Sequence, residues 1–193
     1  MIISDKFKFI CLNPPKTGSG TREALLEEFA SIAVNLTDIK NFQRHASYDQ
    51  MIKFCSEHKI PHEEYFKFTF VRNPWRRIES WYCMKVVQQK LEPTQDEFIK
   101  FVQEREKQHM CCWQDCFFFQ KDIDYIGTTE TMYEDLSKIW VHLGLPKPNR
   151  EEYHGLMPQC VKDLIKTLWT DELIEFVADK EKEVIKLKGY TYE

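Results

Sequence analysis

Residues 7–22 read Phe-Lys-Phe-Ile-Cys-Leu-Asn-Pro-Pro-Lys-Thr-Gly-Ser-Gly-Thr-Arg. The alternating apolar run at the start of this stretch predicts a β-strand, which the two prolines end. The glycines and hydroxyl residues that follow predict a tight turn into a helix that runs to Phe29. In such a turn backbone N–H groups point inward, and the helix N-terminus adds partial positive charge. The stretch therefore predicts a binding site for an anion.

The composition is that of a soluble globular protein. A length of 193 residues fits a single domain over residues 1–193, with enough chain to bury a core. The hydrophobic share is 42% and the charged share 30%. The net charge of −4 excludes a general basic surface, so we expect neither nucleic acid nor an anionic membrane as a partner. Any anion site must therefore be built locally.

The seven cysteines predict reduced thiols. Their number is odd, their spacing is not that of a disulfide framework, and no apolar signal segment precedes Phe7, so we expect a cytoplasmic protein. Cys111, Cys112 and Cys116, with His109 nearby, lack the paired spacing of a zinc site, so we expect no metal. No stretch of the sequence is long and apolar enough to cross a membrane.

Strand and helix patterns alternate along the chain. We expect strands at residues 7–12, 66–72 and 123–127, with a weaker one at 31–36. Helical patterns occupy residues 21–29, 47–58, 75–89, 94–109, 136–143 and 173–187. This alternation predicts an α/β fold of three layers, in which helices cover both faces of a mainly parallel central sheet. Ligands of such sheets bind at the carboxyl ends of the strands, where the first turn lies.

Lys16 is the one cation inside the first turn, and we predict that it binds the anion. Thr17, Ser19 and Thr21 either cap the following helix or donate their hydroxyls to the same anion, and the two roles are compatible. The turn is not a Walker A sequence, because it lacks the G-x-x-x-x-G-K-[ST] pattern. A nucleoside triphosphatase also needs a strand-end carboxylate for magnesium, and the sequence shows no strong candidate.

A second anion-binding segment, residues 70–82, reads Phe-Val-Arg-Asn-Pro-Trp-Arg-Arg-Ile-Glu-Ser-Trp-Tyr. The preceding strand delivers Arg72 to its carboxyl end, and Pro74 suits the first turn of a helix in which Ser80 lies about two turns on. Arg72 offers a planar fork for phosphate oxygens and Ser80 a single neutral donor, so both can bind one phosphate. The alternative is that Arg72 caps the strand end while Ser80 lies on the helix surface.

These two segments resemble the donor-binding motifs of the sulfotransferases. Pro-Lys-Thr-Gly-Ser-Gly-Thr at residues 15–21 resembles their 5′-phosphosulfate loop, and residues 70–82 resemble their 3′-phosphate motif. A weaker resemblance continues at residues 123–130, where Thr128 stands in place of an arginine that is common in the family. The closest likeness is to the carbohydrate branch, which comprises Golgi-type and related bacterial enzymes.

The resemblance implies a P-loop-like sulfotransferase fold and a definite reaction. Such enzymes move the sulfuryl group of 3′-phosphoadenosine 5′-phosphosulfate (PAPS) to a hydroxyl or amine by in-line displacement, and release 3′-phosphoadenosine 5′-phosphate (PAP). Lys16 and the turn amides would stabilise the leaving phosphate, and no metal is required. The donor-binding residues implied are Pro15, Lys16, Thr17, Gly18, Ser19, Gly20, Thr21, Arg72 and Ser80.

An acceptor hydroxyl needs a general base, and we expect His45 to be that base. It lies between the weak second strand and a helix, where related carbohydrate sulfotransferases often place a histidine. Glu63, Glu64 or a glutamate of the helix at residues 21–29 is the alternative, and a lone histidine in a loop is often only a polar surface residue.

The sequence as a whole predicts a soluble, cytoplasmic, PAPS-dependent sulfotransferase that acts on a hydroxyl-bearing small molecule, most simply a saccharide. Golgi-type members carry an N-terminal membrane anchor and a stem, and this sequence shows neither, so we expect a minimal soluble enzyme. Two alternatives stay open. One is a nucleotide kinase-like phosphotransferase, which would need magnesium and prefer ATP, and the other is a non-catalytic module that binds PAP or PAPS. The sequence specifies neither the acceptor nor the oligomeric state.

Overall fold

The computed structural model describes residues 1–33, 42–104, 113–115, 122–146 and 159–192. The chain forms two compact units. The first comprises Met1–Val71 and Phe117–Gly155, and the second comprises Arg72–Cys116 and Leu156–Glu193. Whether the chain acts as the single domain expected over residues 1–193 stays a prediction.

The first unit is built on a four-stranded sheet in the order β1-β2-β3-β4. Its strands are β1 (Ile2–Ser4), β2 (Phe9–Leu12), β3 (Phe66–Val71) and β4 (Tyr125–Thr128). Strands β2, β3 and β4 run parallel, and β1 pairs antiparallel with β2. The three strands predicted from the sequence are confirmed with small shifts of their ends. Because they are parallel, the turns after β2, β3 and β4 leave the sheet at the same edge.

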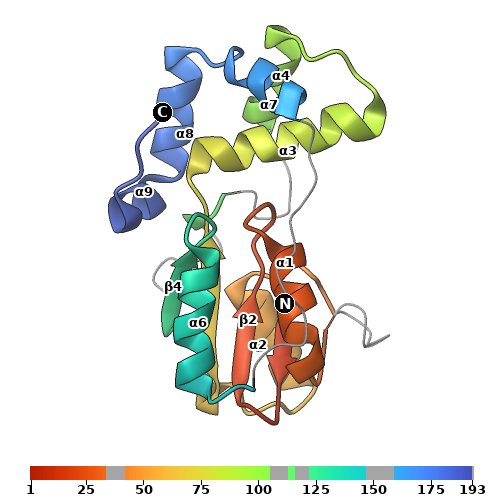
Figure 1. Cartoon of the computed structure of the whole chain (residues 1–193), viewed down its shortest axis with the longest axis vertical. Coiled ribbons are helices and arrows are strands. Elements are labelled where there is room, and N and C mark those ends of the chain that lie inside the picture. Colours follow the sequence, from red (N-terminus) through yellow and green to blue (C-terminus); the bar gives the residue numbers. More distant parts are fainter. Residues whose placement is uncertain (34–41, 105–112, 116–121, 147–158, 193) are drawn as a thin grey trace. The chain divides into compact units, whose positions relative to one another are not determined.

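The sheet is covered on both faces, which confirms the predicted three-layer α/β fold (Figure 1). Phe9 and Cys11 of β2 belong to the core that includes α1 (Ser19–Leu26) and α6 (Met132–Leu143). Ile10 and Leu12 belong to the core on the opposite face, with α2 (Tyr48–Glu57). Alternate residues of one strand therefore anchor different helical layers, as the period of two in a strand requires.

Short elements complete the first unit. The 3-10 turn η1 (Glu27–Phe29) follows α1, and the 3-10 turn η2 (His62–Glu64) precedes β3. Helix α2 begins at a capping box in which Ser47 and Gln50 exchange hydrogen bonds, and α6 ends at Gly144, whose φ is 60°. In the weak strand expected at residues 31–36, Ile32 forms an isolated bridge to Ile3. Residues 34–36 lie outside the described part of the chain.

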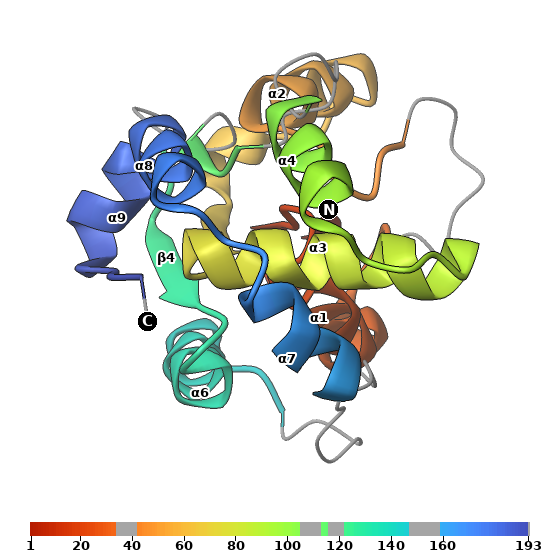
Figure 2. The same cartoon turned by 90° about the horizontal axis from the view of Figure 1, so that it is seen from above.

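The second unit is helical, with its core on one side of α3 (Pro74–Gln89). The other helices that the structure describes in this unit are α4 (Gln95–Gln103), α7 (Gln159–Lys166), α8 (Asp171–Lys180) and α9 (Lys182–Lys188). Figure 2 shows α7 alongside α3. Helix α4 confirms the start of the helix expected at residues 94–109, whose residues 105–109 lie outside the described part.

The single C-terminal helix expected at residues 173–187 is wrong. The chain breaks at Glu181, whose φ of −120° is not helical, and forms α8 and α9 instead. The break turns the Glu181 carboxylate into the core, where it is fully buried against Arg77 of α3 at 3.1 Å. The apolar spacing continues across residue 181, so periodicity alone could not reveal the break.

Candidate functional site

The turn between β2 and α1 has the geometry of an anion site. Gly18 is the N-cap of α1 and adopts a left-handed conformation with φ of 78°. A Cβ at this position would also overlap Cε of Met132 in α6, so glycine is required both by the backbone and by the space. Gly18 has no side chain with which to cap the helix, and the partial positive charge of a helix N-terminus favours a bound anion.

Arg22 holds this turn in place from inside the protein. Its guanidinium is fully buried and donates from Nε to Oδ1 of Asn13 at 3.0 Å. It also donates to the carbonyl and, at 2.9 Å, to the hydroxyl of Thr17, and it lies 4.7 Å from the centre of the Phe70 ring. A buried, fixed set of hydrogen bonds therefore preorganises the turn before any ligand binds.

The candidate ligands in the turn differ in what they can offer. The Thr17 hydroxyl is buried and donates to the carbonyl of Pro14 at 2.8 Å, so its proton is already used within the turn. Ser19 begins α1, and Lys16 is only partly buried. Lys16 has a positive φ of 66°, which is uncommon for a side-chain-bearing residue, although three other lysines among the described residues share that conformation. The turn thus combines one lysine with a helix N-terminus.

The structure brings His45 to the same turn. Nδ1 of His45 lies 2.7 Å from the backbone oxygen of Asn13, the residue that follows β2. A carbonyl only accepts hydrogen bonds, so neutral His45 carries its proton on Nδ1 and keeps a lone pair on Nε2. Burial lowers the pKa of His45 below its ordinary value, against the opposing effect of the Asn13 carbonyl. The ring is therefore neutral near pH 7, as a general base must be.

The alternative bases occupy less suitable positions. Glu63 and Glu64 lie in η2, immediately before β3, and so at the amino end of the parallel strands, away from the edge where the turn leaves β2. Oε1 of Glu63 lies 3.2 Å from Nε2 of His62. In α1, both oxygens of Glu23 accept hydrogen bonds from Arg44, so neither is free to take a proton from a substrate.

The second segment predicted to bind an anion, residues 70–82, lies in the helical unit from Arg72 onward. Arg72 directly follows β3, and Asn73 caps α3 by accepting a hydrogen bond from the N–H of Arg76 at 3.2 Å. Pro74 occupies the first helical position, as its missing N–H favours. Arg72 and Ser80 are both partly exposed.

Gln114 fixes the backbone of Arg72. Its side-chain oxygen accepts the Arg72 N–H at 2.7 Å, and its Nε2 donates to the Arg72 carbonyl at 2.9 Å. Gln114 is itself buried and donates its backbone N–H to the Glu181 carboxylate at 2.9 Å, which also accepts from Arg77. The base of the Arg72 side chain is therefore rigidly held.

The segment after β4 is organised by Asp135 of α6. Its carboxylate accepts from the Thr128 N–H at 2.9 Å, from the Tyr125 hydroxyl at 2.7 Å and from the Thr131 hydroxyl at 2.9 Å. Burial raises the pKa of Asp135, but these hydrogen bonds outweigh burial and hold it below its ordinary value. Thr128 thus has a structural role in shaping this turn.

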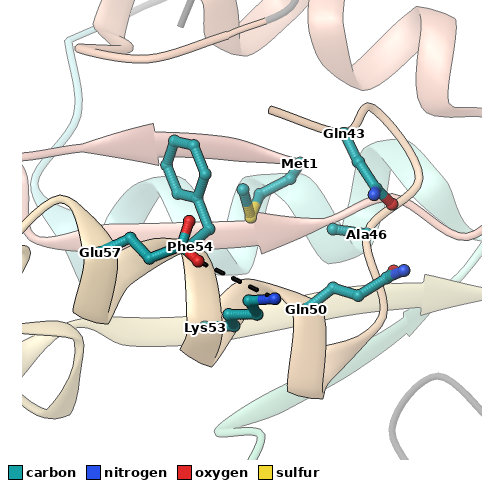
Figure 3. A pocket seen from close by; sticks show the side chains of 7 residues that line it. All are labelled: Met1, Gln43, Ala46, Gln50, Lys53, Phe54 and Glu57. Carbon is teal, nitrogen blue, oxygen red and sulfur yellow. Dashed lines mark ion pairs between the residues drawn. The ribbon is translucent and has the colours of Figure 1, made fainter. Parts of the chain in front are cut away.

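A cavity of about 220 Å³ opens in the first unit beside the segment that carries His45 (Figure 3). Met1, Ala46 and Phe54 supply apolar surface, and Lys53 and Glu57 form an ion pair at 3.9 Å. The amides of Gln43 and Gln50 complete the lining. An apolar surface bordered by amides and charges suits a small polar molecule with C–H faces.

Other candidates fall outside the described residues or form no cluster. Among the residues that the structure describes, no three His, Cys, Asp or Glu side chains gather as metal ligands do. None of the described helices has the length and apolar character needed to cross a membrane. Cys11, Cys55 and Cys83 are buried and form no disulfide. Cys111, Cys112, Cys116 and His109, from whose spacing we expected no metal site, lie outside the described part of the chain.

Sequence reasoning missed the residues that hold the site in place. Arg22 follows the turn directly and Arg44 precedes His45, so proximity to the motifs was the signal for both. Asn13 and Glu23 lie beside the turn but carried no pattern of their own. Gln114 stands in a stretch without periodicity, and only its contacts reveal its role.

The comparisons with known proteins agree with the motifs. A family model described as the sulfotransferase family matches residues 1–159. No curated protein and no solved structure matches the chain significantly.

Proposed function

The chain belongs to the sulfotransferase family, and from this premise we propose that it transfers a sulfuryl group from PAPS to a hydroxyl of a carbohydrate and releases PAP. One observation carries the proposal. The turn that carries Lys16 leads from Asn13 to the N-terminus of α1. The backbone oxygen of Asn13 accepts the hydrogen bond from Nδ1 of His45, which leaves Nε2 of that ring as the basic nitrogen. An anion-stabilising group and a base thus meet at the carboxyl end of one strand.

In the proposed complex the donor is held at its two charged ends. The turn at residues 15–21 binds the 5′-phosphosulfate through Lys16 and the N–H groups of Gly18, Ser19, Gly20 and Thr21. Arg72 and Ser80 bind the 3′-phosphate, and the hydrogen bonds of Gln114 to the Arg72 backbone support this role. The 3′-phosphate distinguishes PAPS from ATP.

The proposed transfer is an in-line displacement at sulfur. Nε2 of His45 takes the proton of the acceptor hydroxyl while its oxygen forms a bond to sulfur. The bond between sulfur and the bridging oxygen of the 5′-phosphate breaks, and the electron pair stays on that oxygen. Lys16 and the amides at the start of α1 stabilise the charge that develops there. Positioning and fixed electrostatics would supply the catalysis, as in phosphoryl transfer.

The cavity beside residues 43–46 supports a saccharide as the acceptor. Phe54 and Met1 offer an apolar surface for the C–H face of a sugar ring, while Gln43 and Gln50 offer amides for its hydroxyls. The lining contains one lysine and one glutamate, already paired with each other, so it favours a neutral sugar over a polyanionic one.

Ligand-induced thermal stabilisation tests the donor. We expect PAP to raise the melting temperature of the protein more than ADP or ATP does, with and without magnesium, and Arg72→Ala to abolish this preference. Equal stabilisation by PAP and ADP would contradict the assignment of the 3′-phosphate site, and a preference for ATP with magnesium would indicate a kinase-like phosphotransferase.

Turnover tests the reaction itself. Labelled PAPS incubated with a panel of neutral sugars, sulfated sugars and phenols should yield a labelled neutral sugar. Labelled phenol alone would overturn the carbohydrate acceptor. Binding of PAP without any labelled product would identify a non-catalytic donor-binding module.

A further inference from the structure

Glu23 lies at the centre of the contacts that surround His45. It is in the second turn of α1, and its side chain is only 8% exposed. Its two oxygens accept hydrogen bonds from Nε of Arg44, at 2.8 Å, and from a terminal nitrogen of the same guanidinium. This paired geometry fixes the direction of the Arg44 side chain as well as its charge. Arg44 is the residue immediately before His45.

Glu23 also contacts the residue to which His45 is bonded. Nδ2 of Asn13 lies 3.4 Å from Oε1 of Glu23, and Oδ1 of Asn13 accepts from Nε of Arg22 at 3.0 Å. A carboxylate on one side and a guanidinium on the other fix the orientation of the fully buried Asn13 side chain. The backbone oxygen of this same residue accepts the hydrogen bond from Nδ1 of His45.

The two contacts of Glu23 thus hold both partners of one hydrogen bond. Through Arg44 the carboxylate restrains the chain that carries His45, and through Asn13 it restrains the acceptor of the imidazole proton. The consequence is chemical, because the bond to Asn13 decides which ring nitrogen of His45 is basic. Both oxygens of the Glu23 carboxylate are occupied by the Arg44 guanidinium, so Glu23 acts through other residues.

We propose that Glu23 is a positioning residue, which holds Arg44 and Asn13 so that His45 keeps its proton on Nδ1 and presents Nε2 as the base. The inference rests on the proposed function in one respect, since His45 is a base only if the transfer reaction takes place. The placement of the proton is a property of the free protein and can be measured without donor or acceptor.

The test is the Glu23→Gln variant, which keeps the shape of the side chain and removes its charge. In wild-type protein with ¹⁵N-labelled histidine, the imidazole nitrogen resonances of His45, assigned by comparison with His45→Gln, should show a proton on Nδ1. In Glu23→Gln they should shift toward a mixture of the two tautomers. The kcat for sulfuryl transfer should fall by up to about 100-fold, while the KM for PAPS changes little.

Two further variants make the result decisive. Glu28→Gln removes a carboxylate from the exposed end of the same segment and should leave both the resonances and kcat unchanged. Arg44→Gln removes the same ion pair from its more exposed side, since the Arg44 side chain is 44% exposed. It should reproduce the effect of Glu23→Gln on the His45 resonances, and it supplies the test if Glu23→Gln folds poorly.

An unchanged Nδ1-protonated His45 in both Glu23→Gln and Arg44→Gln would overturn the inference, whatever happens to kcat. Failure of the proposed function looks different. In that case PAP would not stabilise the wild-type protein preferentially, although the tautomer of His45 would still respond to Glu23→Gln.

Discussion

At the scale of single residues, the environment of His45 sets the pH range in which the protein should work. Burial lowers the pKa of the imidazole from its ordinary value of 6.5. A general base must be unprotonated, so kcat/KM, which reports the free enzyme, should rise with pH through this lowered pKa and be close to its plateau at neutral pH. We therefore expect the acidic limb of the kcat/KM profile to have its midpoint below pH 6.5.

The His45→Ala variant provides the comparison. It should lower kcat by about 10²- to 10⁴-fold, remove the acidic limb, and leave stabilisation by PAP unchanged, because His45 does not contact the donor in the proposed site. A midpoint above pH 6.5 in the wild-type protein, or the same limb in His45→Ala, would show that another group is the base.

The sequence indicates candidate ligand-contacting residues for this site more readily than it indicates the residues that support them. Lys16 and His45 could be selected because their types are those that anion binding and proton transfer require. The structure adds that Asn13 joins the turn to His45 through a backbone oxygen, which no side-chain pattern encodes. Arg22 could have been taken for a second anion ligand from its place in the sequence, yet it is fully buried and bonded to Asn13 and Thr17.

At the scale of elements, the turn between β2 and α1 depends on the left-handed conformation of Gly18. In Gly18→Ala the added Cβ would be strained by the φ of 78° and would overlap Met132 of α6, so either the turn or α6 must shift. We expect a loss of about 1–2 kcal/mol in the free energy of unfolding, together with weaker binding of PAP because the N–H groups of the turn are displaced.

Gly144→Ala is the matched control for this prediction. Gly144 is also left-handed, with φ of 60°, but an added Cβ there meets no atom within 4 Å. This variant should lose a similar amount of stability from backbone strain and keep the wild-type affinity for PAP. Urea unfolding and titration calorimetry measure the two quantities. Wild-type PAP affinity in both variants would mean that the turn does not bind the donor.

Elements with a clear period were predictable, and those defined by tertiary contacts were not. The strands at β2 and β3 and the helix α3 follow from apolar spacing and from Pro74 at a helix start. Strand β1 spans only three residues, too few for a period to be recognised, and it exists because β2 offers it an edge. The division of the C-terminal helix at Glu181 depends on a buried partner about a hundred positions earlier in the chain.

At the scale of the whole molecule, the ion pair of Glu181 with Arg77 should make stability depend on pH. Burial raises the pKa of Glu181 to about 7, against the opposing effect of Arg77, while an unfolded chain would give its ordinary value of 4.5. Between these two values the folded protein binds more protons than the unfolded chain. The free energy of unfolding should therefore fall as pH rises from about 4.5 to about 7, by up to about 3 kcal/mol at about 1.4 kcal/mol per pKa unit.

Urea unfolding of the wild type and of Glu181→Gln at several pH values between 4.5 and 8 isolates this contribution, because His45 and the other titrating groups are present in both proteins. The free energy of unfolding of the wild type minus that of Glu181→Gln should fall as pH rises and level off above pH 7. The double variant Arg77→Met/Glu181→Gln removes both buried charges, so it should also lack the slope and avoid leaving an unpaired guanidinium in the core. Parallel profiles for all three proteins would mean that Glu181 stays ionised throughout this range, with Arg77 and the Gln114 N–H offsetting the effect of its burial.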